Sequence, residues 1–243
     1  MKILLIRLRL IGDVVFTTPL VGALKRTWPE SRLTYLVERD AAPVVAGNPH
    51  LAHVIVVPRT RGWQRIRDDV GLARRLRAER FDVVLDLHGG PRSSWLTWAT
   101  GAPERIGYDI QGRRWQYTRM VHRPHGLQPR HSVANQWALL SALPGWPGLQ
   151  PDPSRDPAEM PLDQVADARI AERLRTAGVG PGHEVTVIHV SAGNPFRRWP
   201  EPAFATLVAG LAAGDHCRRI VLSSGPSDRT AAAALGRHPR QRL

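Results

Sequence analysis

The chain has 243 residues, 42% of them hydrophobic, which is enough for one large or two modest globular domains. Its apolar stretches are shorter than the ~20 residues of a transmembrane helix, and Arg7, Arg9 and Asp13 interrupt the first one, which excludes a signal-peptide pattern. The net charge of +13 is compatible with binding to nucleic acid, to an anionic membrane surface or to a phosphorylated substrate. It can also reflect genomic base composition. The arginines are scattered, and no nucleic-acid-binding signature accompanies them.

The first part of the chain predicts a strand, a turn and a helix. Residues 3–6 are apolar and partly β-branched, as in a strand buried on both sides. Gly12 then allows a tight turn, and Asp13 can accept backbone N–H groups as the cap of a helix. Pro19 either kinks that helix or marks its restart. Ligands bind at the carboxyl ends of strands in Rossmann-like domains, so we expect Asp13 to face a cleft.

Strands and helices alternate through the residues that follow. Further strands are predicted at residues 32–38, 54–57, 82–87 and 102–108. Helices are predicted at residues 41–46, 72–81, 93–100 and 131–143. This order predicts an α/β fold in which residues 1–150 form a doubly wound domain with a parallel sheet.

The remaining residues predict a second, incomplete domain. Residues 151–183 are expected to form a linker and a helix, because this region begins rich in Pro and Asp. Residues 184–243 predict a Rossmann-like domain with strands at 185–190 and 219–223. Two parallel strands make a poor sheet core, so apolar surface on them should be exposed.

Polar and basic residues mark two further candidate positions. Asp86 and His88 lie at the end of a predicted strand, on the cleft side. They are either structural polar groups or a His/Asp pair for hydrolysis. No nucleophile-elbow motif with a serine and no metal-ligand spacing accompanies them. An arginine-rich stretch suits a mobile loop that faces a phosphorylated acceptor as well as it suits a solvated surface. Its members are Arg59, Arg61, Arg65 and Arg67.

Several segments resemble one enzyme family in the same order. The segment from Leu10 to Pro19, with its Gly-Asp turn, resembles the N-terminal motif of the ADP-heptose:lipopolysaccharide heptosyltransferases, glycosyltransferase family 9. The other matching segments are residues 86–90, 105–108, 131–140 and 197–200. The resemblance implies a GT-B fold of two Rossmann-like domains, of which the first binds the acceptor and the second binds the nucleotide sugar. It also implies transfer with inversion, without an essential metal or cofactor.

The resemblance assigns roles to individual residues. Asp13 would be the catalytic base, although a plain helix cap also explains it. Arg197 matches a lysine of many members and would stabilise the departing diphosphate, although a solvated loop anchored by Trp199 also explains this segment. The other nucleotide-sugar contacts would be Ser191, Gly193, Asn194 and Asp228, the last equally well explained as a helix cap. The acceptor side would comprise Gly12, His88, Arg59, Arg61, Arg65 and Arg67.

The implied reaction is transfer of a heptose from ADP-heptose to the lipopolysaccharide inner core. The partners would be an ADP-sugar donor and a lipid A–core or related anionic saccharide, not nucleic acid. The one cysteine, Cys217, can form no internal disulfide, which favours a cytoplasmic protein; peripheral contact with the inner face of the inner membrane stays open. Two alternatives also stay open: another GT-B enzyme such as an epimerase, and a non-catalytic remnant that binds anionic saccharide.

One segment of the family has no counterpart before Leu243. Family members carry an Asp-Thr-Gly-x-x-His segment that closes over the nucleotide phosphates, and its absence from this sequence suggests a truncated chain. We therefore expect residues 1–243 alone to bind ADP poorly and to show no measurable heptosyl transfer.

Overall fold

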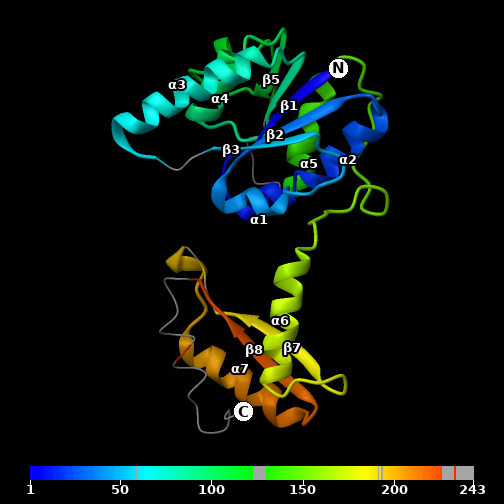
Figure 1. Ribbon diagram of the computed structural model, residues 1–243, viewed down its shortest axis with the longest axis vertical. Coiled ribbons are helices and arrows are strands. Elements are labelled where there is room, and N and C mark those ends of the chain that lie inside the picture. The colour runs from blue at the N-terminus through cyan, green and yellow to red at the C-terminus, as the bar shows by residue number, and fades with distance from the viewer. Residues whose placement is uncertain (58–59, 123–129, 191, 193, 226–232, 234–243) are drawn as a thin grey trace. The chain divides into compact units, whose positions relative to one another are not determined.

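A computed structural model describes residues 1–57, 60–122, 130–190, 192, 194–225 and 233. It divides into two compact units, Met1–Pro161 and Leu162–Leu243, each considered by itself (Figure 1). Residues 151–161, which we expected in a linker, belong to the first unit, where Arg26 pairs with Asp156. The assignment of acceptor and nucleotide binding to separate domains stays a prediction.

The described part of the first unit contains a parallel sheet of six strands in the order β3-β2-β1-β4-β5-β6. The strands are β1 Lys2–Ile6, β2 Arg32–Glu38, β3 His53–Val57, β4 Val83–Asp86, β5 Glu104–Tyr108 and β6 Arg119–Val121. The first five confirm the predicted strands. β6 was not predicted, because it is a short, largely exposed edge strand without an apolar run. The strand order reverses between β1 and β4, and in such sheets a ligand crevice lies outside the carboxyl ends of the strands at that point.

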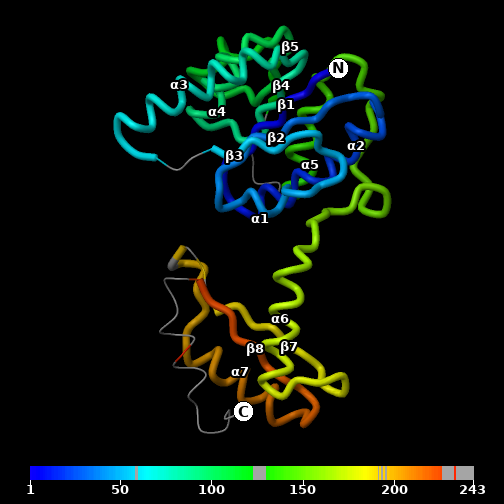
Figure 2. The backbone as a smooth tube through the Cα atoms, in the orientation of Figure 1, coloured from blue at the N-terminus to red at the C-terminus, as the bar shows by residue number. Residues whose placement is uncertain are grey.

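Helices cover both faces of this sheet (Figures 1 and 2). The α-helices of this unit are α1 Ile11–Val15, α2 Thr18–Thr27, α3 Gly62–Ala78, α4 Pro91–Ala99 and α5 Ser132–Trp137. Alternate residues of β1 point to the two layers: Ile3 and Leu5 pack with α2 and α5, whereas Leu4 and Ile6 pack with α3 and α4. The 3-10 helices are η1 Arg39–Val44, η2 Arg114–Gln116 and η3 Ala138–Ala142.

The predicted break near Pro19 is a helix restart. α1 ends at Val15 and α2 begins at Thr18 with Pro19 in its first turn. Thr17 occupies the cap position, but its hydroxyl donates to the Val14 carbonyl at 2.6 Å and lies 2.7 Å from the Tyr35 hydroxyl. Burial raises the pKa of Tyr35 above its ordinary value, so this hydroxyl stays protonated and joins α1 to β2.

The second unit has a small core on one side of two parallel strands. Its elements are α6 Gln164–Thr176, β7 Glu184–His189, η4 Pro195–Arg197, α7 Glu201–Gly214 and β8 Arg218–Ser223. Ile188 and Val190 pack with Val208 of α7, whereas Val185 and Val187 on β7 are 42% and 64% exposed. The predicted exposure of apolar surface on this sheet is confirmed. Among the described residues, no helix is long and apolar enough to cross a bilayer.

The two sides of β7 should respond differently to the same kind of substitution. Ile188→Thr should destabilise the β7–β8 sheet by about 2 kcal/mol, because it places a hydroxyl in the core beside Val208. Val187→Thr should change this free energy by less than about 0.5 kcal/mol. Hydrogen exchange of the β7 and β8 amides measures both, and equal effects would contradict the assigned sides.

Candidate active site

The turn after β1 places Asp13 at the carboxyl edge of the sheet. Leu10 precedes α1 with a φ of 70°, in the left-handed region that costs a non-glycine residue about 1 kcal/mol. We expected Gly12 to make this turn, but Gly12 is helical, so that explanation is wrong. A Cβ on Gly12 would meet no atom within 4 Å. Gly12 therefore leaves open space over the first turn of α1.

A buried arginine holds the carboxylate of Asp13. Arg7 is 7% exposed; its Nη2 pairs with Asp13 Oδ2, and its Nη1 donates to the Leu87 carbonyl at 2.7 Å. We expected the Asp13 carboxylate to accept backbone N–H groups as a helix cap. This is wrong, because the carboxylate accepts from the Arg7 guanidinium instead. The Asp13 side chain is 27% exposed, and no described residue donates a hydrogen bond to its Oδ1. Asp13 is thus an anchored carboxylate with one oxygen left for a ligand.

Asp86 is the centre of a hydrogen-bond network at the end of β4. Its Oδ1 accepts from the backbone N–H groups of His88 and Gly89 at 3.0 and 2.9 Å, and its Oδ2 accepts from Ser93 Oγ at 3.0 Å and Tyr117 Oη at 2.7 Å. Burial raises the pKa of Asp86 above its ordinary value, and these hydrogen bonds oppose the rise. The structural interpretation of Asp86 is confirmed. His88, half-buried in the same loop, keeps its acceptor role as a proposal only.

Two glycines of the matching segments make this network possible. A Cβ on Gly107 would run into the ring of Tyr117, so only glycine lets that ring lie on β5 and reach Asp86. Gly89 has a φ of 67°, and its Cβ would come within 3.1 Å of the Tyr108 ring. Burial and the neighbouring Asp86 raise the pKa of Tyr117, which therefore remains a donor.

Residues at the start of α5 and within it contact α1 and the residue that follows it. The ring of His131 meets that of Phe16 edge-on at 5.2 Å, and Gln136 Nε2 donates to the Asp13 carbonyl at 3.3 Å. Gln136 is only 4% exposed. The segment at residues 131–140 therefore positions the backbone that carries Asp13. A helical apolar pattern predicts this helix but says nothing about the buried glutamine within it.

The basic stretch was expected in a loop, which is wrong for Arg65 and Arg67, because α3 already begins at Gly62. Arg61 precedes the helix, and Arg65 and Arg67 are exposed on its first turns, with Arg65 Nε 3.8 Å from Asp69. α3 follows the carboxyl end of β3, so these arginines belong to the same edge of the sheet as Asp13.

A partly buried group of charged residues fixes the middle of α3. Arg92 of α4 donates through Nε to Asp69 at 3.0 Å and through Nη1 to Glu38 at 3.2 Å. This contact joins α3, α4 and β2, and sequence reasoning missed it because the three residues are far apart in the chain.

Part of the predicted nucleotide-sugar site lies in the second unit after β7. Asn194 and Arg197 are exposed on one turn: Asn194 Oδ1 accepts from the Phe196 N–H at 3.1 Å, and the Arg197 N–H donates to the Asn194 carbonyl at 2.9 Å. These two predicted residues are brought together. Four other predicted site residues lie outside the described residues: Arg59, Ser191, Gly193 and Asp228.

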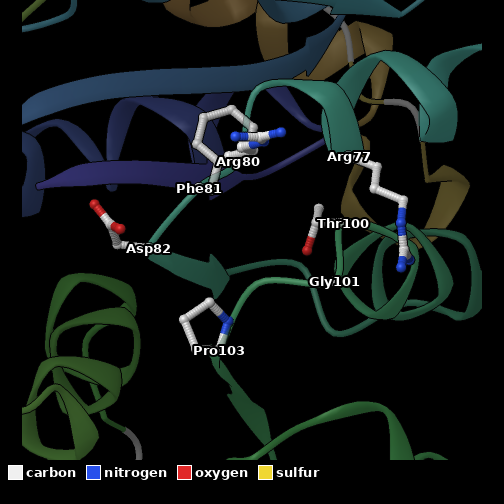
Figure 3. Close-up of a pocket in the computed structure, with 7 residues that line it drawn as sticks. All are labelled: Arg77, Arg80, Phe81, Asp82, Thr100, Gly101 and Pro103. Atoms are coloured by element: carbon white, nitrogen blue, oxygen red, sulfur yellow. The ribbon is translucent and has the colours of Figure 1, made fainter.

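A cavity of about 370 Å³ lies at the opposite edge of the sheet from Asp13 (Figure 3). Asp82 and Pro103, which precede β4 and β5, line it together with Arg77 and Arg80. α3 and α4 both end there, and the negative ends of their dipoles offset the two arginines. The described residues contain no group of three or more His, Cys, Asp or Glu that could hold a metal ion.

Comparison with known proteins identifies one family. A family model described as glycosyltransferase family 9 (heptosyltransferase) matches residues 70–241. Lipopolysaccharide heptosyltransferase 3 of Escherichia coli is 26% identical over 226 residues, which is 90% of this chain and 62% of that protein. Lipopolysaccharide heptosyltransferase 1 of Pseudomonas aeruginosa is 31% identical over 120 residues, 47% of this chain and 34% of that protein. The chain spans less than two thirds of the length of these curated relatives.

Solved structures show the same fold. A family 9 glycosyltransferase from Veillonella parvula superposes with a TM-score of 0.83 at 23% identity, covering 97% of this chain and 65% of that one. The E. coli heptosyltransferase WaaC with ADP-2-deoxy-2-fluoro heptose gives a TM-score of 0.69 at 20% identity, covering 98% and 73%. The predicted α/β fold of the GT-B type is confirmed.

Removal of the Arg7 charge should destabilise the first unit. Arg7→Met should lower the free energy of unfolding by about 2 kcal/mol, because Asp13 and the Leu87 carbonyl lose a charged donor in a buried position. Urea unfolding measures the change. Arg119→Met, which breaks the exposed pair with Glu104, is the control and should have little effect. Equal losses in the two variants would contradict the structural role of Arg7.

Asp86 should make stability depend on pH. A carboxyl group whose folded-state pKa is raised contributes stability that is fully present below its unfolded pKa of about 4 and is lost as the pH rises through the raised value. Urea unfolding across this range should therefore show wild type losing stability relative to Asp86→Asn as pH rises. The exposed Asp167→Asn serves as the control. A constant difference between wild type and Asp86→Asn would refute the assigned direction.

Proposed function

The chain belongs to glycosyltransferase family 9, and on that premise we propose that it transfers a heptose from ADP-heptose to the inner core of lipopolysaccharide. The observation that carries this proposal is the carboxylate of Asp13, anchored through one oxygen by Arg7 at the carboxyl end of β1. The relatives named lipopolysaccharide heptosyltransferases and the WaaC structure with an ADP-heptose analogue support the choice of donor and acceptor.

Asp13 suits the role of general base by its position. Arg7 and the Gln136 contact to the Asp13 carbonyl restrict both its side chain and its backbone. The acceptor hydroxyl would donate to Oδ1, which no described residue occupies. As the hydroxyl oxygen attacks the anomeric carbon, its proton passes to Asp13, and the bond from that carbon to the ADP oxygen breaks. Attack opposite the leaving group inverts the anomeric configuration.

The departing ADP gains negative charge, which a cation can stabilise. Arg197 is the proposed cation, because it is exposed on the turn after β7 beside Asn194, and its guanidinium can bind two phosphate oxygens. Ser191, Gly193 and Asp228 remain proposed donor contacts, and Gly12, His88, Arg59, Arg61, Arg65 and Arg67 remain proposed acceptor contacts. The predicted cytoplasmic location is part of the same proposal.

A transfer assay with ADP-heptose and a lipid A–core acceptor tests the proposal. Because the relatives are longer, the assay uses a chimera in which residues 1–243 continue into the C-terminal part of the E. coli heptosyltransferase 3. Asp13→Asn should lower turnover by at least ~100-fold and leave ADP binding nearly unchanged, because the proposed donor contacts lie in the second unit. Undiminished transfer by this variant would exclude Asp13 as the base.

Two further variants separate the roles. Asp68→Asn on α3 is the matched control and should leave turnover unchanged. Arg197→Ala should weaken ADP binding, and Arg197→Lys, which restores the residue type of many family members, should recover most of it. A chimera that binds ADP yet forms no heptosylated product would refute the proposed reaction.

A further inference from the structure

α3 carries apolar side chains on two different sides. Leu72, Ala73 and Leu76 are buried against the sheet, as expected of a surface helix with one core-facing stripe. Trp63, Ile66 and Val70, by contrast, are 82%, 53% and 36% exposed. Residues three, four and seven apart share one side of a helix, so these three form a second apolar stripe. Packing in the first unit does not explain it.

Arginines continue this second stripe along the helix. Arg67, Arg74 and Arg77 follow Trp63 and Val70 at steps of three and four residues, and all three are exposed. None of the three guanidinium groups is hydrogen-bonded or ion-paired with another described residue. Arg77 lies at the far end, beside Gly101 (Figure 3). We call the stripe of Trp63, Ile66, Arg67, Val70, Arg74 and Arg77 the outer face of α3.

The acidic residues of the helix are engaged away from this stripe. Asp69 binds Arg92 and lies on the core side with Leu72 and Leu76, and Asp68 accepts from Gln64 at 3.2 Å. The outer face therefore combines net positive charge with an exposed indole and two aliphatic side chains. Tryptophan and arginine are the side chains that suit the boundary between lipid headgroups and acyl chains.

We propose that the outer face of α3 docks on an anionic phospholipid surface, with Trp63 and Ile66 entering the headgroup region and Arg67, Arg74 and Arg77 binding lipid phosphates. Charge complementarity selects this occupant, because the stripe offers three exposed cations, without a carboxylate partner among the described residues, interleaved with apolar side chains. The inference goes beyond glycosyl transfer and does not depend on it. It places the arginine-rich start of α3, at the same sheet edge as Asp13, next to the membrane.

Vesicle co-sedimentation of the 243-residue chain tests this proposal. Wild type should bind phosphatidylcholine vesicles that contain phosphatidylglycerol much more tightly than pure phosphatidylcholine vesicles. Trp63→Ser combined with Ile66→Ser should weaken binding at least tenfold. Arg67→Ala combined with Arg74→Ala should weaken it about 25-fold, at roughly fivefold for each cation near an anionic surface. Both double variants replace exposed side chains, and an unchanged thermal unfolding midpoint confirms that each remains folded.

A control variant distinguishes binding through the outer face of α3 from general electrostatic attraction of a basic protein to anionic vesicles. Arg169→Ala combined with Arg173→Ala removes the same charge from exposed positions on α6 and should change binding less than twofold. A loss equal to that of the α3 arginine variant would overturn the proposal. So would equal binding to neutral vesicles, or wild-type binding by the Trp63 and Ile66 variant.

Fluorescence locates the contact independently. Brominated phospholipid should quench tryptophan emission of the bound wild-type chain, and Trp63→Phe should bind similarly but show a clear loss of that quenching. Trp115→Phe, at another exposed tryptophan, is the matched control and should leave the quenching unchanged. Quenching that survives in Trp63→Phe would refute this placement of α3.

Discussion

The buried guanidinium of Arg7 joins the candidate active site to the core of the sheet. A charge with so little contact with water is stable only when it is paired and hydrogen-bonded, and Arg7 finds both conditions at the strand ends: the carboxylate of Asp13 and the carbonyl of Leu87. These partners follow β1 and β4, the two strands between which the sheet order reverses. One side chain thus fixes a carboxylate at the point where folds of this class bind ligands.

A second buried polar group organises the neighbouring loop without taking part in the proposed chemistry. Asp86 receives four hydrogen bonds from the loop, α4 and Tyr117, which closes the end of β4 onto β5. The glycine at residue 107 is required because the Tyr117 ring occupies the space of its Cβ. Asp86 and Gly107, which lie in two segments by which the chain resembles its family, therefore have structural roles beside the segment that carries Asp13.

The proposed reaction and the proposed membrane surface place different demands on the same part of the first unit. Asp13 needs a rigid setting, which Arg7 and Gln136 provide from within the core. The outer face of α3 needs exposure and unpaired charge, while Arg92 and Asp69 keep the helix fixed from its inner side.

Local pattern was sufficient to predict five strands of the first sheet, the α/β order and the position of Asp13 after the first strand, because each of these depends on apolar runs and breaks within a few neighbouring residues. Tertiary structure alone decided the pairing of Arg7 with Asp13, the role of Gln136 and the reason for Gly107, because each depends on side chains that meet only after the strands are aligned. It also decided that Leu10, not Gly12, is the strained residue of the turn. Tertiary structure also showed which apolar side of α3 packs against the sheet and which is exposed.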